Sequence, residues 1–127
     1  MNIGAASAAS GVSQRMIRHY EKIGLVPPPP RRGSYREYGD ADVHRLRFIA
    51  NARDLGFPID EIRTLLELWS DRTRSSADVK ALAQARANEL SRKARALDLM
   101  RQVLDDLARS CQGNNHPDCP IIDRLAQ

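Results

Sequence analysis

The chain has 127 residues, which favours one domain or a domain with an appendage. No stretch approaches the roughly 18 consecutive apolar residues of a membrane span. The start of the chain, which Arg15 and Arg18 interrupt, does not resemble a signal peptide, so we expect a cytoplasmic protein without membrane contact. Two cysteines in such a chain argue against a disulfide scaffold and favour metal or redox chemistry.

The net charge of +4 is confined to the first part of the chain. Residues 1–57 hold nine Lys or Arg and five Asp or Glu, whereas residues 58–127 hold eleven of each kind. A basic segment beside a neutral one favours an anionic partner for the basic segment. On charge alone, an ordinary solvated basic surface is an equally good explanation.

The N-terminal segment predicts two short helices joined by a glycine turn. Asn2 is suited to cap a first helix that runs to Ala9. Ser13 is suited to cap a second helix, Gln14–Lys22, and Gly11 lies between the two. Two short helices around a glycine turn are the helix-turn-helix pattern.

A small β wing is expected next, after four consecutive prolines that exclude a helix. Residues 31–34 are typical of a turn, and residues 35–38 alternate in the manner of a strand. Asp40 is predicted to cap a third helix over residues 41–55, with Val43, Leu46, Ile49 and Ala50 facing inward. Pro58 and Asp60 are predicted to start a fourth helix.

Ser75 or Ser76 opens a long helix that we expect to run to about Ala108. More than thirty residues at about 1.5 Å each make a rod of roughly 50 Å. Small and apolar residues recur along it, mostly in steps of three and four: Ala83, Ala87, Leu90, Ala94, Leu97, Met100, Leu104 and Leu107. A second copy of the chain is the simplest partner for this stripe. A helix folded back on its own domain is the alternative.

The second helix presents side chains that suit contact with DNA. Gln14, Arg15 and Arg18 lie on the face opposite the apolar residues Met16 and Ile17. The predicted DNA-binding set is Gln14, Arg15, Arg18, Tyr20, Arg31, Arg32, Tyr35, Arg36 and Arg53. A single arginine in such a set more often contacts a phosphate than a base. The predicted partner is therefore double-stranded DNA.

Cys111 and Cys119 flank seven residues that contain Gly and Pro, so they border a loop after the long helix. Such a loop can fold two thiolates toward one ion. Two soft thiolates without an obvious third ligand suit a two-coordinate soft ion such as Cu(I), whereas zinc normally recruits four ligands. His116 is a further candidate ligand, although a solvated histidine is the commoner outcome in a loop. Spacing alone is a weak signal, because two cysteines in a chain of this size are often incidental.

Three motifs in order resemble the mercuric-resistance-regulator (MerR) family of transcription factors. They are Ile17–Leu25, the wing Tyr35–Tyr38, and Arg53–Phe57. The resemblance covers almost the whole chain and implies a mainly α fold. It implies a winged helix-turn-helix head with a small β wing, then a long antiparallel coiled-coil dimerisation helix and a C-terminal metal-binding loop. It also implies a homodimer on promoter DNA, and no enzyme.

This resemblance divides the chain into three parts by function. Residues 1–70 are the expected winged helix-turn-helix DNA-binding domain, and residues 71–110 are the expected linker and long dimerisation helix. Residues 111–127 are the expected metal-binding loop and short C-terminal helix.

The cysteine loop and the start of the long helix resemble the copper-efflux-regulator branch of the family. Cys111 and Cys119 are followed by Pro120-Ile121-Ile122, and Ser76–Lys80 opens the long helix. In that branch a serine stands at the Ser76 position, supplied by the partner subunit, whereas relatives for divalent metals have a third cysteine there. The resemblance therefore implies Cu(I) as effector, with Ag(I) and Au(I) chemically similar. Ser76 is equally suited to be a helix N-cap.

The implied function is transcriptional activation: the metal-bound dimer distorts promoter DNA so that RNA polymerase engages both promoter elements, which switches on copper-efflux genes. A Zn(II), Cd(II) or Pb(II) sensor and a thiol redox sensor are alternatives within the family. A thiol enzyme with Cys111 or Cys119 as nucleophile lacks an apolar pocket wall in this polar loop. A purely structural coiled-coil adaptor leaves the basic head unexplained.

Overall fold

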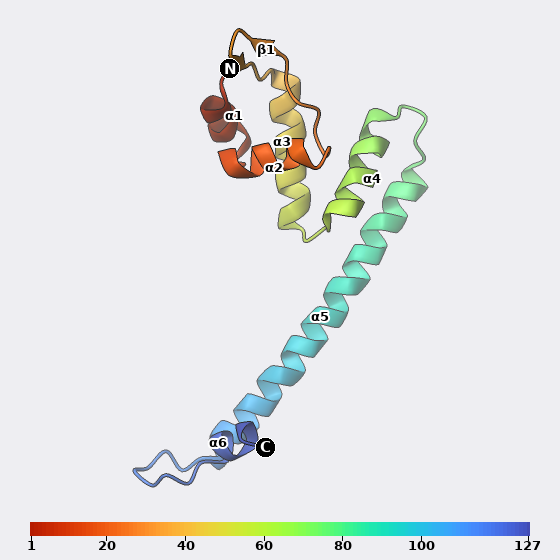
Figure 1. Cartoon of the computed structure of the whole chain (residues 1–127). Coiled ribbons are helices and arrows are strands. Elements are labelled where there is room, and N and C mark those ends of the chain that lie inside the picture. Colours follow the sequence, from red (N-terminus) through yellow and green to blue (C-terminus); the bar gives the residue numbers. More distant parts are fainter. The chain divides into compact units, whose positions relative to one another are not determined.

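The computed structural model describes residues 1–127 and is mainly helical. Its helices are α1 (Ile3–Ser10), α2 (Gln14–Lys22), α3 (Asp40–Asp54), α4 (Ile59–Ser70), α5 (Ser76–Ser110) and α6 (Pro120–Leu125). The chain separates into two compact units, residues 1–82 and residues 83–127, which we describe one at a time. No helix combines the length and the apolar character needed to cross a membrane. The predicted mainly α class, with a small wing and one long helix, is confirmed (Figure 1).

The first two helices begin at the predicted caps. The Asn2 side chain accepts a hydrogen bond from the Ala5 amide at 2.8 Å. The Ser13 hydroxyl accepts one from the Met16 amide at 3.2 Å, so each side chain satisfies an amide that the helix leaves without a partner. Gly11 follows α1 with φ of 77°, a left-handed conformation that glycine adopts without steric cost.

The wing is a two-stranded antiparallel sheet of β1 (Arg31–Arg32) and β2 (Tyr35–Arg36). Arg31 pairs with Arg36 and Arg32 pairs with Tyr35, so the turn consists of Gly33 and Ser34. The prediction of a turn over residues 31–34 was therefore wrong for its first two residues. The predicted strand over residues 35–38 is also too long, since β2 ends at Arg36. Tyr38 lies beyond the strand, is only 3% exposed and belongs to the core.

The core of the first unit forms where α1, α2, α3 and α4 come together with the segments that join them (Figure 1). Its buried apolar residues are Ala6, Val12, Ile17, Tyr20, Leu25, Val26, Tyr38, Val43, Leu46, Ile49, Ala52, Phe57, Ile62 and Leu66. Three of the four residues predicted to face inward on the third helix are buried, and Ala50 is partly buried at the edge of the core. This core holds α2 and the wing on one scaffold.

The start of α3 differs from the prediction by one residue. Gly39 is the N-cap and Asp40 is the first helical residue. The carboxylate of Asp42 accepts a hydrogen bond from the Gly39 amide at 2.8 Å, which is the role expected of a side chain in the first helical turn. Asp40 therefore does not cap the helix. It lies in the first turn, where a negative charge suits the helix dipole.

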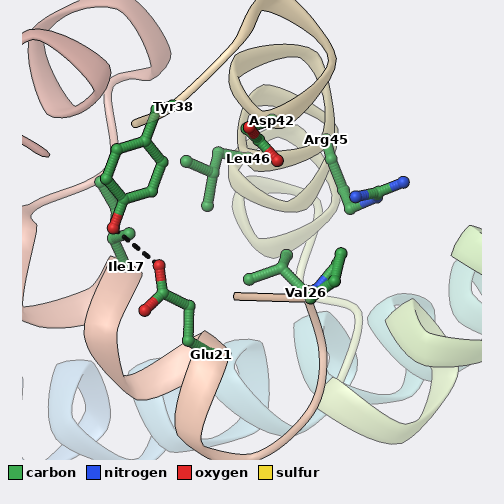
Figure 2. Close-up of a pocket in the computed structure, with 8 residues that line it drawn as sticks. Ile17, Glu21, Val26, Tyr38, Asp42, Arg45 and Leu46 are labelled. Carbon is green, nitrogen blue, oxygen red and sulfur yellow. Dashed lines mark hydrogen bonds between the residues drawn. The ribbon is translucent and has the colours of Figure 1, made fainter. Parts of the chain in front are cut away.

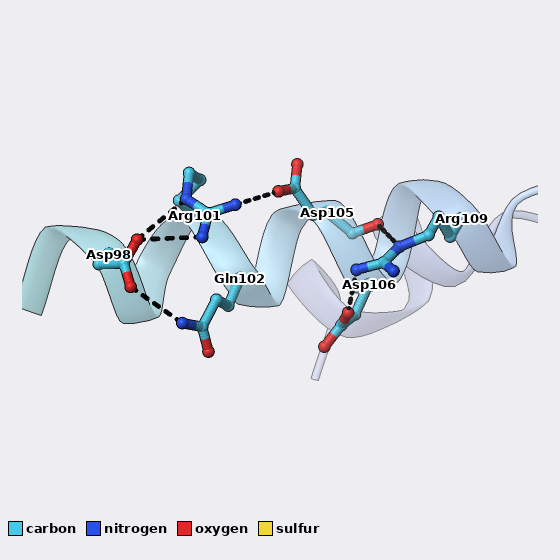
Figure 3. A network of polar contacts seen from close by, with 6 residues as sticks. All are labelled: Asp98, Arg101, Gln102, Asp105, Asp106 and Arg109. Carbon is cyan, nitrogen blue, oxygen red and sulfur yellow. Dashed lines mark hydrogen bonds and ion pairs between the residues drawn. The ribbon is translucent and has the colours of Figure 1, made fainter.

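The long helix α5 has 35 residues, and none of them is buried. Leu90, Leu97 and Leu104 of the predicted stripe are 45%, 64% and 57% exposed. Ion pairs run along the helix surface: Arg101 contacts Asp98 at 3.0 Å and Asp105 at 2.5 Å, and Arg109 contacts Asp106 at 2.7 Å (Figure 3). Exposed pairs at this spacing contribute about 0.3–0.5 kcal/mol each, so they support the helix without covering its apolar stripe.

The core predicts a contrast between two aliphatic truncations in the first unit. Ile49 is 0% exposed whereas Leu55 is 64% exposed. We expect Ile49→Ala to lower the free energy of unfolding by about 2–4 kcal/mol through lost burial and a cavity. We expect Leu55→Ala to change it by less than about 0.5 kcal/mol. Urea unfolding at one fixed protein concentration measures both, and equal losses would contradict the described core.

Candidate functional site

The helix α2 turns a polar, basic face to solvent. Gln14, Arg15 and Arg18 are all exposed. On the opposite face Ile17 is 0% exposed and anchors the helix in the core. The predicted division of α2 is therefore present for Ile17, whereas Met16, which was also expected on the apolar side, is exposed.

The wing places further basic and aromatic side chains beside this face. Arg31, Arg32 and Tyr35 are exposed, and Tyr35 is 74% exposed. A shallow groove between the start of the chain, α2 and the wing is lined by Asn2, Ile3, Arg18, Ser34, Tyr35 and Arg36. The fold thus brings Arg18 of α2 and the wing, far apart in the sequence, to one open groove that can receive a polyanion.

Three residues of the predicted DNA-binding set differ from the others: Tyr20 is buried, and Arg36 and Arg53 make hydrogen bonds within the chain. Tyr20 is only 4% exposed and packs in the core, because it lies one turn along the buried face of α2 from Ile17. Tyr20 therefore does not project toward solvent as a surface contact. Arg53 is exposed at the end of α3, and its guanidinium donates to the Phe57 carbonyl at 3.4 Å.

A buried carboxylate that the sequence analysis missed is paired with Arg36, one of the residues that line the groove. The side chain of Glu21 is 6% exposed and forms an ion pair with Arg36 of the wing. The Tyr38 hydroxyl donates to the same carboxylate at 2.7 Å (Figure 2). Burial, together with this hydrogen bond, raises the pKa of Tyr38. The signal in the sequence was the spacing of Glu21, four residues after Ile17, which puts a charge on the apolar face of a helix.

The two cysteines meet in the second unit. The sulfur of Cys111, just after α5, lies 3.7 Å from the sulfur of Cys119, which is the N-cap of α6. Both thiols are free, since a disulfide requires about 2.05 Å. Two metal–sulfur bonds of about 2.3 Å are together long enough to span this gap. The donor set therefore fits one soft ion held by both sulfurs.

The start of α6 favours the thiolate form of Cys119. The backbone amides of Ile122 and Ile121 lower the pKa of the Cys119 thiol, and contact with Cys111 lowers it further. Burial and Asp123 oppose the shift without reversing it. Metal binding requires the thiolate, so the helix end assists a metal ligand.

The loop between the cysteines supplies no further ligand group. Asn114 accepts a hydrogen bond from the His116 amide at 3.0 Å, and Gly113 turns the chain with φ of 63°. No three His, Cys, Asp or Glu side chains are gathered closely enough to hold an ion. His116, the further candidate ligand from the sequence, is exposed. Within one chain the candidate metal ligands are therefore the two thiolates.

At the start of α5 the two adjacent serines have different roles. The Ser75 hydroxyl accepts a hydrogen bond from the Ala77 amide at 3.1 Å, which is a capping contact. Ser76 is the first residue of the helix and is exposed. Because Ser75 makes the capping contact, helix capping does not account for the choice of serine at position 76.

The sequence matches two family descriptions that overlap. Residues 1–69 match "MerR HTH family regulatory protein" and residues 43–107 match "MerR, DNA binding". Regulators of this family bind promoter DNA, typically as dimers. The family predicted from the three sequence motifs is therefore confirmed, and so is the prediction of a DNA-binding regulator rather than an enzyme.

Individual relatives match over nearly the whole chain. The chain is 56% identical to the HTH-type transcriptional regulator HmrR of Sinorhizobium medicae, over 100% of this chain and 87% of that protein. It is 40% identical to the HTH-type transcriptional regulator CueR of Vibrio cholerae, over 98% of this chain and 91% of that protein.

Solved structures of other proteins also match this chain over nearly its whole length. The transcription regulator PbrR691 of Ralstonia metallidurans, in complex with lead(II), has a TM-score of 0.85 and 32% identity, over 98% of each chain. MerR of Bacillus megaterium, in complex with mercury(II), has a TM-score of 0.71 and 31% identity, over 96% of this chain and 95% of that one. By sequence and by structure, this chain belongs to the MerR family of helix-turn-helix transcriptional regulators.

Proposed function

We propose that the protein is a Cu(I)-responsive transcriptional activator that binds promoter DNA as a homodimer and switches on copper-efflux genes. The observation that carries the proposal is the pair of thiols, Cys111 and Cys119, with sulfurs 3.7 Å apart and no third ligand gathered beside them. The names of relatives support a metal effector: a 55% identical protein of Rhizobium meliloti is called "Heavy metal-dependent transcription regulator 2".

The choice of metal rests on the number and the softness of the ligands. Two thiolates suit Cu(I), and also Ag(I) or Au(I), better than a divalent ion that recruits more ligands. The partner subunit's Ser76, at the position where a third cysteine would add a soft ligand, favours the same choice. A lead, cadmium or zinc regulator is the second candidate, favoured by the similarity to the lead(II)-bound PbrR691 at 32% identity.

The thiolate pair joins two elements of the second unit. Cys111 follows the last turn of α5, where its amide donates to the Leu107 carbonyl at 3.1 Å, and Cys119 starts α6. When bound, the ion supplies a link between these two helix ends. The loop can accommodate that link, because Gly113 permits the tight turn between them.

The head supplies the contact with DNA in this proposal. Gln14, Arg15 and Arg18 enter the major groove from α2, while Arg31, Arg32 and Tyr35 contact phosphates or the minor groove from the wing. Residues 1–70 thus bind DNA, residues 71–110 dimerise, and residues 111–127 sense the metal in the cytoplasm. Metal binding biases the dimer toward a conformation that distorts the promoter and lets RNA polymerase engage it.

The dimer can be tested by placing a charge in the stripe of α5. We expect Leu97→Asp to give monomers and to abolish operator binding, because dimerisation would bury the new carboxylate among apolar side chains. The control Asn88→Asp places the same charge on the opposite, exposed face of α5 and should leave the dimer intact. Analytical ultracentrifugation at micromolar concentration measures both, and a wild-type monomer would contradict the proposal.

DNA binding should depend on the exposed face of α2. We expect Arg18→Ala to weaken operator binding by about 1–3 kcal/mol if Arg18 reads a base. If Arg18 instead holds a phosphate, the loss of affinity should depend less on the DNA sequence. Arg95→Ala removes the same charge from α5 and is the matched control. Fluorescence anisotropy over a range of salt concentrations measures the loss and its electrostatic part. Equal affinities of both variants and the wild type would show that the head does not dock in this way.

The metal to which the protein responds should depend on the number and kind of its ligands. We expect Cys111→Ser and Cys119→Ser each to abolish copper induction yet preserve operator binding, because each substitution removes half of the ligands. His116→Ala is the control in the same loop and should retain induction. Ser76→Cys adds a soft ligand and should raise the response to divalent ions.

Reporter assays with Cu, Ag, Zn and Pb salts, together with gel shifts on the purified variants, measure these effects. Full copper induction in Cys111→Ser would contradict the thiolate site. A strong wild-type response to zinc without a response to copper would contradict the choice of metal in favour of the second candidate.

A further inference from the structure

The carboxylate of Glu21 on α2 is fully engaged by the segment that contains the wing. Arg36 of β2 donates to one carboxylate oxygen, and the Tyr38 hydroxyl donates to the other at 2.7 Å (Figure 2 shows the second bond). Only 6% of the Glu21 side chain is exposed, against 37% for Arg36. A buried carboxylate is costly unless it is paired and hydrogen-bonded, so the folded head favours keeping both partners in place.

The wing needs such an anchor because it is very short. Each strand has two residues, and an isolated two-stranded hairpin is at best marginally stable in water. In addition, Arg31 lies directly opposite Arg36 in the strand pair, and like charges in this arrangement repel one another. Glu21 neutralises Arg36 and thereby relieves this repulsion.

We propose that Glu21 is a positioning residue for DNA recognition, which fixes the wing relative to α2 by holding Arg36 and Tyr38. The proposal rests on the proposed function, in which α2 and the wing contact the same DNA. Because Arg31 and Arg32 are paired in register with β2, fixing Arg36 also fixes these two exposed cations. The charge of Arg36 is then committed to Glu21, and Arg31 and Arg32 are the wing cations left to contact phosphates.

Simple electrostatics makes the opposite prediction for removal of the Glu21 charge. Loss of a negative charge from a basic head should strengthen its attraction to phosphates. A role in positioning requires binding to weaken, since an untethered wing must be ordered when DNA binds. Whether affinity for DNA rises or falls therefore distinguishes simple electrostatics from a positioning role of Glu21.

The test compares Glu21→Gln with Glu37→Gln in the full-length protein. The first variant keeps the size of the side chain and an oxygen that can accept from Tyr38, but it removes the ion pair. The second makes the same change of charge beside Arg36, at a side chain that is 47% exposed. The probe is a fluorescent duplex selected by the wild-type protein from a random library, with a scrambled duplex of equal length for comparison.

We expect Glu21→Gln to bind the selected duplex about tenfold more weakly, the loss typical of one misplaced contact. Glu37→Gln should bind as tightly as the wild type or more tightly. In an Arg36→Gln background, Glu21→Gln should cause no further loss, because the ion pair is already absent and the glutamine oxygen can still accept from Tyr38. A folded Glu21→Gln protein that binds the selected duplex as tightly as the wild type, or more tightly, would overturn the proposal.

A second variant covers the case in which Glu21→Gln does not fold. Tyr38→Phe removes one of the two bonds to Glu21 without changing any charge, so weaker binding supports the positioning role and unchanged affinity overturns it. A wild-type protein that selects no duplex at all contradicts the proposed function itself. Failure of the proposed function is thereby separated from failure of the role of Glu21.

Discussion

The long helix α5 leaves an apolar face exposed, since none of its 35 residues is buried. Leu90, Leu97 and Leu104 are about half exposed or more, and full burial of one leucine side chain contributes roughly 1.5–3 kcal/mol. A second copy of the chain can cover this face along its length. Regulators of this family typically bind DNA as dimers, and a twofold dimer binds two DNA half-sites related by the same symmetry. The proposed DNA-binding unit and metal sensor both depend on this pairing.

The side chains that stabilise each part of the chain are different from the side chains proposed to bind DNA and metal. The apolar core of residues 1–82 fixes α2, and the buried Glu21 carboxylate connects that helix to a wing too short to be stable alone. In residues 83–127, backbone amides at the start of α6 favour the thiolate of Cys119 beside Cys111. Each candidate site thus depends on one helix. The helix α2, anchored in the core, presents the cations, and the N-terminus of α6 favours the thiolate of Cys119.

The sequence predicted local features better than contacts between distant residues. The caps Asn2 and Ser13 and the bounds of α2 followed from local hydrogen-bonding rules and are confirmed. The burial of Tyr20 follows from its position one turn beyond Ile17 on the buried face of α2. The ion pair of Glu21 with Arg36, fifteen residues further along, depends on how the wing packs on α2, which no local pattern encodes. The approach of Cys111 to Cys119 was expected from the loop, whereas the thiolate-stabilising amides required the start of α6 at Pro120.

We propose that two thiolates make this regulator respond to a soft monovalent ion. The most direct measurement is anaerobic titration of the reduced wild-type protein with Cu(I), followed by in vitro transcription from its own promoter. We expect one Cu(I) bound per chain and transcription that rises with that occupancy, while Zn(II) and Pb(II) have little effect. Transcription that responds to Zn(II) or Pb(II) and not to Cu(I), or Cu(I) binding that leaves transcription unchanged, would contradict the proposal.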